Sequence, residues 1–227
     1  MFQRDEDLPE LSPTPAPWSL RGHGWIVLLH LPKGDEARSA FVPTELRRSV
    51  RAPLSVLACV EYDEAPCGPY REVLFIPGSM RFADGRRHFS ISRIVVSTWA
   101  SVVSGRTNWG IPKDRADIAV EHGPNGDRVV VSDAGRECCV LEFGEPSAPR
   151  LGLRTRWLPA SWQTLAQRYR ERTYFYRPEA TGSVRPCFLR RWRFDAARFP
   201  DLERATVLAA LRVEDFAMTF PVADVLA

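Results

Sequence analysis

Short apolar segments separated by turn residues recur along most of the chain, and this pattern constrains the fold more than any other feature of the sequence. Alternating apolar residues rich in β-branched and aromatic side chains are typical of strands. Glycine- and proline-containing dipeptides separate the segments, and Asn125-Gly126 is a good hairpin signal. We expect strands at 25–31, 54–62, 70–76, 88–97, 128–132, 137–142 and 150–158, with 128–132 and 137–142 as the hairpin arms. Strands spaced so evenly favour an antiparallel sandwich, cone or barrel.

Helices are expected to be few, and the chain is expected to form one domain. The best candidates for amphipathic helices are 161–172 and, shorter, 99–106. The sequence has 227 residues, is 44% hydrophobic, and shows no internal repeat or linker that would divide it. Four prolines within 8–18 disfavour a helix or a central strand there. We therefore predict a Pro-rich N-terminal arm at 1–19 and a single domain at 20–227.

Several broad classes of protein are disfavoured by the sequence. No apolar run approaches the length that spans a bilayer, and the first residues are polar and acidic, unlike a signal peptide. We therefore expect a cytoplasmic location and no membrane partner. The five cysteines include no C-x-x-C pair and the four histidines no H-x-x-x-H pair, so we expect no metal. We also expect no cofactor.

Lysine is scarce in this chain. Of 31 basic residues only Lys33 and Lys113 are lysines, and the rest are arginines. Arginine stays charged, whereas a lysine removed from water can lose its proton and attack a carbonyl. An ordinary lysine has a pKa of about 10.4 and needs roughly 4–5 kcal/mol of destabilisation of its ammonium form to become a nucleophile near pH 7. Lys113 lies in the apolar, turn-like segment NWGIPKD at 108–114, which suits that role. A carboxylate beside the amine would favour the protonated form, so we expect Asp114 to point away.

The segment at 108–114 resembles the active-site turn of the acetoacetate decarboxylase family, in which a Gly-x-Pro-Lys sequence carries the lysine that forms a Schiff base. Two further segments are similar to family motifs in the same order along the chain. Residues 67–73 (CGPYREV) resemble a strand entry whose glutamate lines the active site. Residues 20–28 (LRGHGWIVL) resemble the first strand, which is preceded by an arginine that contacts the substrate carboxylate. Family members often carry a second lysine after the catalytic one, and here that residue is Asp114.

This resemblance implies both a fold and a site. The fold is a β-rich α+β domain whose mostly antiparallel strands form a closed cone- or barrel-like double sheet with a few short helices. The implied catalytic residues are Lys113 and Glu72, and the implied substrate-binding residues are Arg21, Tyr70 and Trp109. A small keto acid would form an iminium ion on the lysine and lose carbon dioxide. The family's other active-site carboxylate has no matching motif, and Glu61 and Glu64 are the nearby candidates.

Three other functions stay open at this stage. The same iminium ion supports aldol or dehydration chemistry without decarboxylation, and a member of this fold can also bind a small ligand without catalysis. Between residues 150 and 193 there are 11 arginines interleaved with aromatic residues, a combination typical of single-strand nucleic-acid binders. A subunit interface or the steering of an anionic substrate explains that segment better. We therefore expect no nucleic-acid partner, and we expect a homo-oligomer, as is common in the family.

Overall fold

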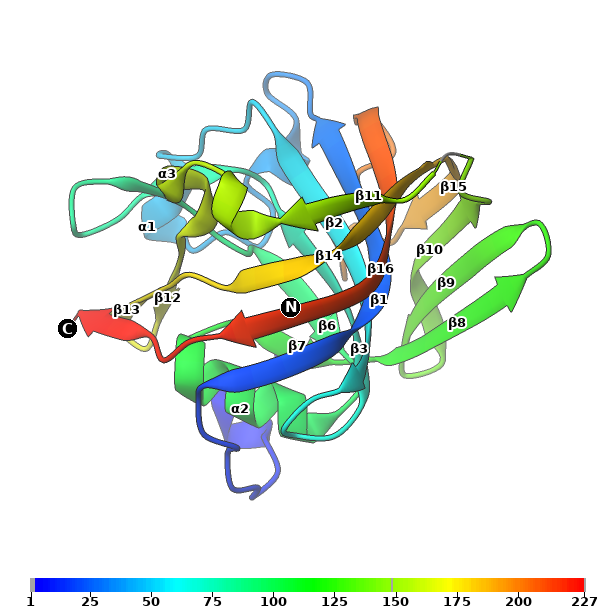
Figure 1. Ribbon diagram of the computed structural model, residues 1–227. Coiled ribbons are helices and arrows are strands. Elements are labelled where there is room, and N and C mark those ends of the chain that lie inside the picture. Colours follow the sequence, from blue (N-terminus) through cyan, green and yellow to red (C-terminus); the bar gives the residue numbers. More distant parts are fainter. Residues whose placement is uncertain (1–2, 148, 227) are drawn as a thin grey trace.

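The computed structural model describes residues 3–147 and 149–226, and most of them lie in strands (Figure 1). The largest sheet has eight strands in the order β11-β14-β16-β1-β2-β3-β6-β7. Adjacent strands of this sheet pair antiparallel, except that β6 and β7 pair parallel. The strands are β1 (Trp18–His30), β2 (Ser55–Glu64), β3 (Tyr70–Ile76), β6 (Arg93–Val96), β7 (Lys113–Arg115), β11 (Leu151–Arg154), β14 (Glu179–Cys187) and β16 (Thr206–Phe220). We call this the main sheet.

Two smaller sheets accompany the main sheet. A four-stranded sheet has the order β15-β10-β9-β8 and a five-stranded sheet the order β17-β13-β12-β5-β4. Their strands are β8 (Asp117–Gly123), β9 (Gly126–Asp133), β10 (Arg136–Gly144), β15 (Leu189–Phe194), β4 (Ser79–Arg81), β5 (Arg87–Phe89), β12 (Leu165–Tyr169), β13 (Arg172–Tyr176) and β17 (Asp224–Leu226). In the part of the chain that the structure describes, no sheet closes on itself. The β-rich fold is therefore confirmed, and the closed cone or barrel is not.

The predicted hairpin arms 128–132 and 137–142 do pair, as β9 and β10, but Asn125-Gly126 is not the turn that joins them. Asn125-Gly126 lies between β8 and β9, which pair from Asp117↔Ser132 to Gly123↔Gly126. The strand β9 and its other neighbour β10 are joined instead through Ala134 and Gly135, both of which have positive φ. Because both turns carry suitable residues, the local signals did not decide which strands each one connects.

Helices are short and few, as expected. They are α1 (Thr44–Arg47), α2 (Trp99–Trp109) and α3 (Ala160–Gln163), with 3-10 turns η1 (Asp5–Asp7), η2 (Glu36–Arg38) and η3 (Thr155–Trp157). The helix expected at 99–106 is present as α2. The helix expected at 161–172 was wrong, because β12 and β13 form a hairpin there that turns at Arg170 and Glu171, both with positive φ. Pairing with aromatic residues of the partner strand outweighs the local helical pattern.

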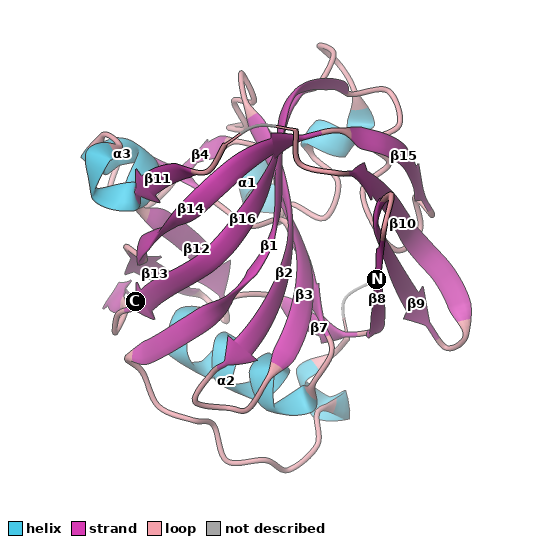
Figure 2. Cartoon of the chain, turned by 45° about the vertical axis from the view of Figure 1, so that its right-hand side comes forward, coloured by secondary structure: helices cyan, strands magenta, loops and turns pink. Residues whose placement is uncertain are grey.

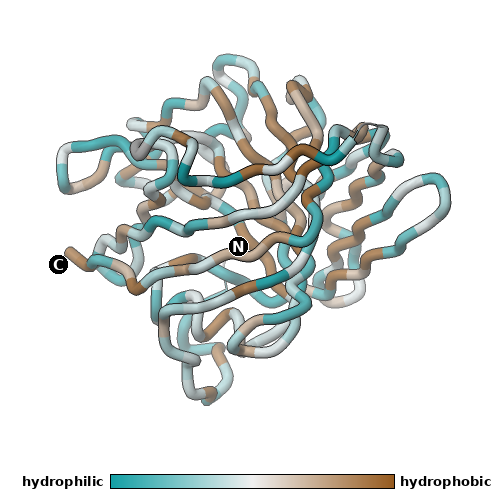
Figure 3. Tube along the Cα trace, in the orientation of Figure 1, coloured by the Kyte–Doolittle hydropathy of each residue, from teal (hydrophilic) through white to brown (hydrophobic). Residues whose placement is uncertain are grey.

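Alternation along the strands gives the main sheet two buried faces. Residues such as Trp25, Cys59 and Phe75 belong to one core cluster, which also contains residues of β8, β9 and β10. Tyr62 and Tyr70 belong to a second cluster that contains residues of α2. Figure 2 shows the four-stranded sheet on the right and α2 below the main-sheet strands. Hydrophobic positions recur along the strands and hydrophilic ones in the peripheral loops (Figure 3). We call the side of Tyr62 and Tyr70 the cavity face and the other side the opposite face.

The described part of the N-terminal segment packs on the domain. The carboxylate of Asp5 accepts hydrogen bonds from Tyr169, from Arg170 and from Nη1 of Arg106. Gln3 bonds to the backbone of Arg115 through its side chain. These contacts fix the segment against the end of α2 and the β12–β13 hairpin. Across the described residues, no helix has the length and apolar character that crossing a membrane requires.

Candidate active site

Lys113 is held in place by the helix that precedes it. The side chain of Thr98 accepts a hydrogen bond from the backbone N–H of Ser101 and so caps the start of α2. Gly110 ends the helix at φ 62°, a left-handed conformation that favours glycine. The chain then enters β7, where Lys113 pairs with Ile94 of β6. This connection places the lysine on the cavity face, where it is only 4% exposed.

Three polar groups surround the amine of Lys113. Its Nζ lies 3.0 Å from Ser101 Oγ, 3.3 Å from Glu72 Oε2 and 3.4 Å from Tyr70 OH. The nitrogen also lies 5.0 Å from the centre of the Tyr70 ring. Ser101 comes from α2, whereas Glu72 and Tyr70 come from β3. Two elements far apart in sequence therefore define the position of one nitrogen atom.

Gly105 of α2 makes room for the lysine side chain. A Cβ atom at this position would lie 2.6 Å from Cδ and 2.9 Å from Cε of Lys113. Both distances are shorter than van der Waals contact, so no larger residue fits without moving the lysine. Gly105 therefore lets α2 approach β7 closely enough for the amine to reach Glu72.

Tyr62 orients the carboxylate of Glu72. Tyr62 donates a hydrogen bond of 2.9 Å to Glu72 Oε1, and its ring stacks on that of Tyr70 with centroids 4.5 Å apart. Burial, followed by the nearby Glu72 carboxylate, raises the pKa of both phenols well above its ordinary value. Both hydroxyl groups therefore keep their protons at neutral pH, Tyr62 as a donor to Glu72 and Tyr70 as an acceptor from Nζ of Lys113.

A cavity of about 330 Å³ opens beside the amine. Most of its lining is apolar, and Lys113, Glu72 and Tyr70 line it together with Trp109. The other lining residues from the main sheet and α2 region include Trp18, Leu20, Ile26, Val60, Tyr62, Leu74, Ile76, Ile91, Ile94, Ile111, Met218 and Phe220. Trp109 forms part of the cavity wall. A hydrogen bond from its Nε1 to Pro221 O and an edge contact with Trp18 fix its position. Four of the five site residues expected from the sequence thus meet at one cavity.

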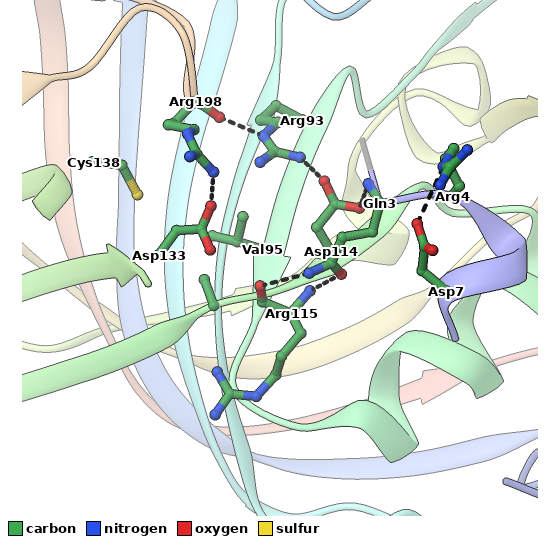
Figure 4. Close-up of a pocket in the computed structure, with 11 residues that line it drawn as sticks. Gln3, Arg4, Asp7, Arg93, Val95, Asp114, Arg115, Asp133, Cys138 and Arg198 are labelled. Carbon is green, nitrogen blue, oxygen red and sulfur yellow. Dashed lines mark hydrogen bonds and ion pairs between the residues drawn. The ribbon is translucent and has the colours of Figure 1, made fainter. Parts of the chain in front are cut away.

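Asp114 points away from the amine, as expected from the sequence. Its carboxylate lies on the opposite face of the main sheet and pairs with the buried guanidinium groups of Arg93 and Arg106. Figure 4 shows this side of β7, where a separate cavity of about 190 Å³ is lined by Asp114, Arg93 and Gln3 among others. Successive residues of a strand face opposite sides of a sheet. The carboxylate next to Lys113 in sequence is therefore not part of its surroundings.

Arg21 is not brought to the Lys113 cavity, and this corrects its expected position. Its side chain is 69% exposed and pairs at 3.8 Å with Glu64, which is exposed as well. In β1 the neighbouring residue Leu20 faces the cavity, so Arg21 faces away from it. Glu61 is also outside the cavity, because it lies on the opposite face beside His23. Among the described residues that line the cavity, none is an arginine.

Sequence reasoning missed three residues of the site. Ser101 and Gly105 lie on α2, four residues apart and therefore on one face of the helix. Small residues at this spacing just before Lys113 are the sequence signal that could have suggested them. Tyr62 lies two residues before Glu64 at the end of β2, where nothing in the local sequence marks it as a partner of Glu72. The cross-strand pair Tyr62↔Tyr70 becomes visible only once the register of β2 and β3 is known.

Solved structures with the same arrangement of strands include several enzymes. The chain is similar to an acetoacetate decarboxylase from Legionella pneumophila, with a TM-score of 0.69, 11% identity, and 98% of this chain and 93% of that chain covered. It is similar to an acetoacetate decarboxylase-like enzyme from Sphingomonas wittichii RW1, with a TM-score of 0.66, 14% identity, and 96% and 98% covered. It is also similar to the enduracididine biosynthesis enzyme MppR in complex with pyruvate, with a TM-score of 0.63, 16% identity, and 96% and 93% covered. Neither a family model nor a curated protein sequence matches the chain.

Proposed function

The chain has the acetoacetate decarboxylase-like fold, and we propose that it is a lysine Schiff-base lyase that decarboxylates a small keto acid on Lys113. The observation that carries the proposal is the position of the Lys113 amine, which is buried at the edge of an apolar cavity with Glu72, Ser101 and Tyr70 around it. A buried lysine beside a carboxylate and an unfilled apolar space is poorly explained by a structural role alone.

The first step requires a neutral amine, and Glu72 is placed to accept its proton. At 3.3 Å, Oε2 of Glu72 lies within reach of the proton that Nζ must lose. The neutral nitrogen then attacks the ketone carbon of the substrate and forms a carbinolamine. Loss of its hydroxyl group as water needs a proton, which the protonated Glu72 returns. The hydroxyl oxygen atoms of Tyr70 and Ser101 accept hydrogen bonds from Nζ and hold the nitrogen toward the cavity.

The second step uses the iminium ion as an electron sink. The bond between the β-carboxylate and the α-carbon breaks, its electron pair moves toward the iminium nitrogen, and carbon dioxide leaves with an enamine behind. Protonation of the enamine carbon and addition of water to the resulting iminium release the ketone product and regenerate Lys113. Every proton in this sequence passes between substrate, water and Glu72, so the proposal needs no further cofactor.

The cavity favours a substrate with an apolar substituent. The described residues that line the cavity include no arginine. The carboxylate of the bound substrate would therefore lie near the iminium ion formed on Lys113 and otherwise against largely apolar walls. A carboxylate loses more hydration free energy in an apolar cavity than the transition state for decarboxylation, in which the negative charge is spread over more atoms. An apolar cavity therefore favours the loss of carbon dioxide. We therefore expect β-keto acids with an aromatic or alkyl group to be better substrates than acetoacetate.

Aldol-type condensation is the second candidate. The volume of about 330 Å³ exceeds the need of a three- or four-carbon keto acid and would admit an apolar aldehyde beside the enamine. One of the similar structures is MppR with the condensation product of pyruvate and imidazole 4-carboxaldehyde. A non-catalytic ligand-binding role is the third candidate, and adduct formation on Lys113 separates it from the first two.

Trapping with borohydride tests the proposal directly. The protein is incubated with a panel of keto acids that includes acetoacetate, benzoylacetate, 3-oxooctanoate and pyruvate, then reduced, digested and analysed by mass spectrometry. We expect a reduced adduct on the peptide that contains Lys113, and carbon dioxide release from the β-keto acids. Adduct without carbon dioxide release would favour condensation over decarboxylation.

The two lysines of the chain supply a matched pair of variants. Lys113→Arg should abolish the adduct, whereas Lys33→Arg, which alters the other lysine, should leave it unchanged. No adduct with any member of the panel would sink the proposal. An adduct retained in Lys113→Arg would show that the nucleophile has been assigned to the wrong residue.

A further inference from the structure

A second cluster of reactive side chains lies on the opposite face of the main sheet. Nε2 of His23 and Nε2 of His122 each lie 3.1 Å from the same atom, Oε1 of Glu61. The three ligand atoms all lie within 4.8 Å of one another. The residues come from β1, β2 and β8, so the cluster joins the main sheet to the four-stranded sheet.

The backbone fixes this cluster. His23 pairs with Glu61 across β1 and β2, and it is flanked by Gly22 and Gly24. A Cβ atom at either glycine would collide with a backbone oxygen atom of β2, so the two strands approach here more closely than other residues would allow. Glu61 is buried, and Arg71 donates from Nε to its Oε2 at 2.9 Å. Its Oε1 is thereby left for the two histidines.

A carboxylate stands behind each histidine ring. Asp63 Oδ2 lies 3.2 Å from Nδ1 of His23, and Asp127 Oδ1 lies 2.7 Å from Nδ1 of His122. An ionised carboxylate only accepts hydrogen bonds, so each Nδ1 carries the proton. In a neutral imidazole the lone pair then resides on Nε2. Two ring nitrogen atoms and one carboxylate oxygen atom therefore converge on a single point, an arrangement that suits a bound cation.

We propose that His23, Glu61 and His122 bind a divalent transition-metal ion, with zinc as the best fit. Ligand atoms about 2.0–2.1 Å from a tetrahedral zinc ion lie roughly 3.3 Å apart. The distance from each histidine Nε2 to Oε1 of Glu61, 3.1 Å, is close to this value. Imidazole and carboxylate are ligands that zinc accepts, and carboxylates behind the ligating histidines are the usual supporting groups. The side chain of His122 is 48% exposed, so a water molecule has access to the fourth position.

The proposed metal site is separate from the cavity that contains Lys113. Glu61 and Tyr62 are consecutive residues of β2 and face opposite sides of the main sheet, so the two sites are separated by the sheet itself. Arg212 pairs with Asp127 at 3.1 Å and lies over the ring of Trp25, which stacks on His122. These contacts hold His122 in place before an ion arrives. Binding would therefore cross-link two sheets whose packing forms one of the core clusters.

The competing explanation is an ion-pair network without metal. In that case both histidines would be doubly protonated, and each would donate from Nε2 to Glu61. The two explanations differ in whether the Nε2 atoms of His23 and His122 bind a proton or a metal ion at neutral pH. Neither arrangement was expected from the sequence, because the expectation of no metal rested on short-range spacing and these residues are far apart along the chain.

Metal binding is measured on the whole chain after treatment with a chelator. Zn²⁺ is titrated by calorimetry, and Co²⁺ by the visible absorption that a four-coordinate site produces. We expect one strong site per chain and a rise in melting temperature with metal concentration, because an ion that binds only the folded state stabilises it. His122→Gln, at a half-exposed position, and Glu61→Gln should weaken binding by at least about 100-fold.

His30→Gln provides the matched control, because His30 is an exposed histidine of the same strand as His23. It should bind the ion like the unaltered chain. Failure to bind Zn²⁺ or Co²⁺, or binding that survives His122→Gln, would overturn the proposal. So would a nitrogen NMR spectrum at pH 7 in which both ring nitrogens of His23 and His122 carry protons in the presence of Zn²⁺.

Discussion

Nζ of Lys113 and Oε2 of Glu72 lie 3.3 Å apart, on strands whose residues are 41 positions apart in sequence. Both side chains are about 5% exposed. A buried pair of this kind is costly to desolvate, and its charges can be removed by moving one proton between the partners. The pair is therefore suited to deliver a neutral amine when a carbonyl compound fills the cavity.

Glu72→Gln tests the proton transfer. The amide keeps the shape and a hydrogen bond from Tyr62 but cannot accept a proton, so turnover on the best keto acid should fall by about 10²–10⁴-fold. Steady-state release of carbon dioxide measures the change. Glu64→Gln, at an exposed position, is the control and should leave the rate unchanged. Full activity in Glu72→Gln would rule out Glu72 as the proton acceptor.

Gly105→Ala tests the close approach of α2 to the lysine. The added Cβ would lie 2.6 Å from Cδ of Lys113 and displace the amine from Glu72. Because alanine favours a helix interior by about 1 kcal/mol over glycine, the melting temperature should change little while borohydride adduct formation falls at least tenfold. Gly152→Ala, where an added Cβ meets nothing within 4 Å, should leave adduct formation unaltered. Equal adduct yields in the two variants would refute the steric argument.

Asp114→Asn tests the buried charges behind the site. The change leaves Arg93 and Arg106 without their shared carboxylate in a buried environment. Removing one partner of a buried ion pair costs about 3–5 kcal/mol, whereas an exposed pair contributes about 0–1 kcal/mol. Urea unfolding should therefore show a large loss for Asp114→Asn and almost none for Asp117→Asn, whose carboxylate is exposed. Similar losses in both variants would contradict the assignment.

The N-terminal contact should weaken in acid. Burial raises the pKa of Asp5, but hydrogen bonds from Tyr169, Arg170 and Arg106 outweigh it and lower the pKa below its ordinary value. A carboxyl group with a lowered pKa in the folded state stabilises the fold above its unfolded pKa of about 3.9, and that stability is lost as the pH falls through the folded pKa.

Hydrogen exchange measures this loss. Backbone amides at 3–8 should be protected at pH 7 and exchange faster, relative to intrinsic rates, as the pH falls below about 4. In Asp5→Asn the amides at 3–8 should be weakly protected at every pH, and their protection should no longer change with the ionisation of residue 5. Protection that stays constant in the unaltered chain down to pH 2 would speak against the role of the carboxylate.

Short-range patterns in the sequence predicted a good part of this molecule. The strand content, the helix at 99–106, and the turn that carries Lys113 all follow from residues close together in the chain. The expected helix at 161–172 failed because its residues pair with a strand of aromatic side chains that local propensity does not register.

The sequence by itself marked Lys113, because the scarcity of lysine and the apolar turn around it are local facts. Only the tertiary structure decided which of its neighbours share its surroundings. It placed Asp114 and Arg21 on other sides of the main sheet and brought Ser101 and Tyr62 to the amine and its partner carboxylate. The physical reason is that a strand exposes alternate residues to opposite faces. A shift of one residue in the pairing would exchange those faces, so sequence order alone cannot say which side chains meet.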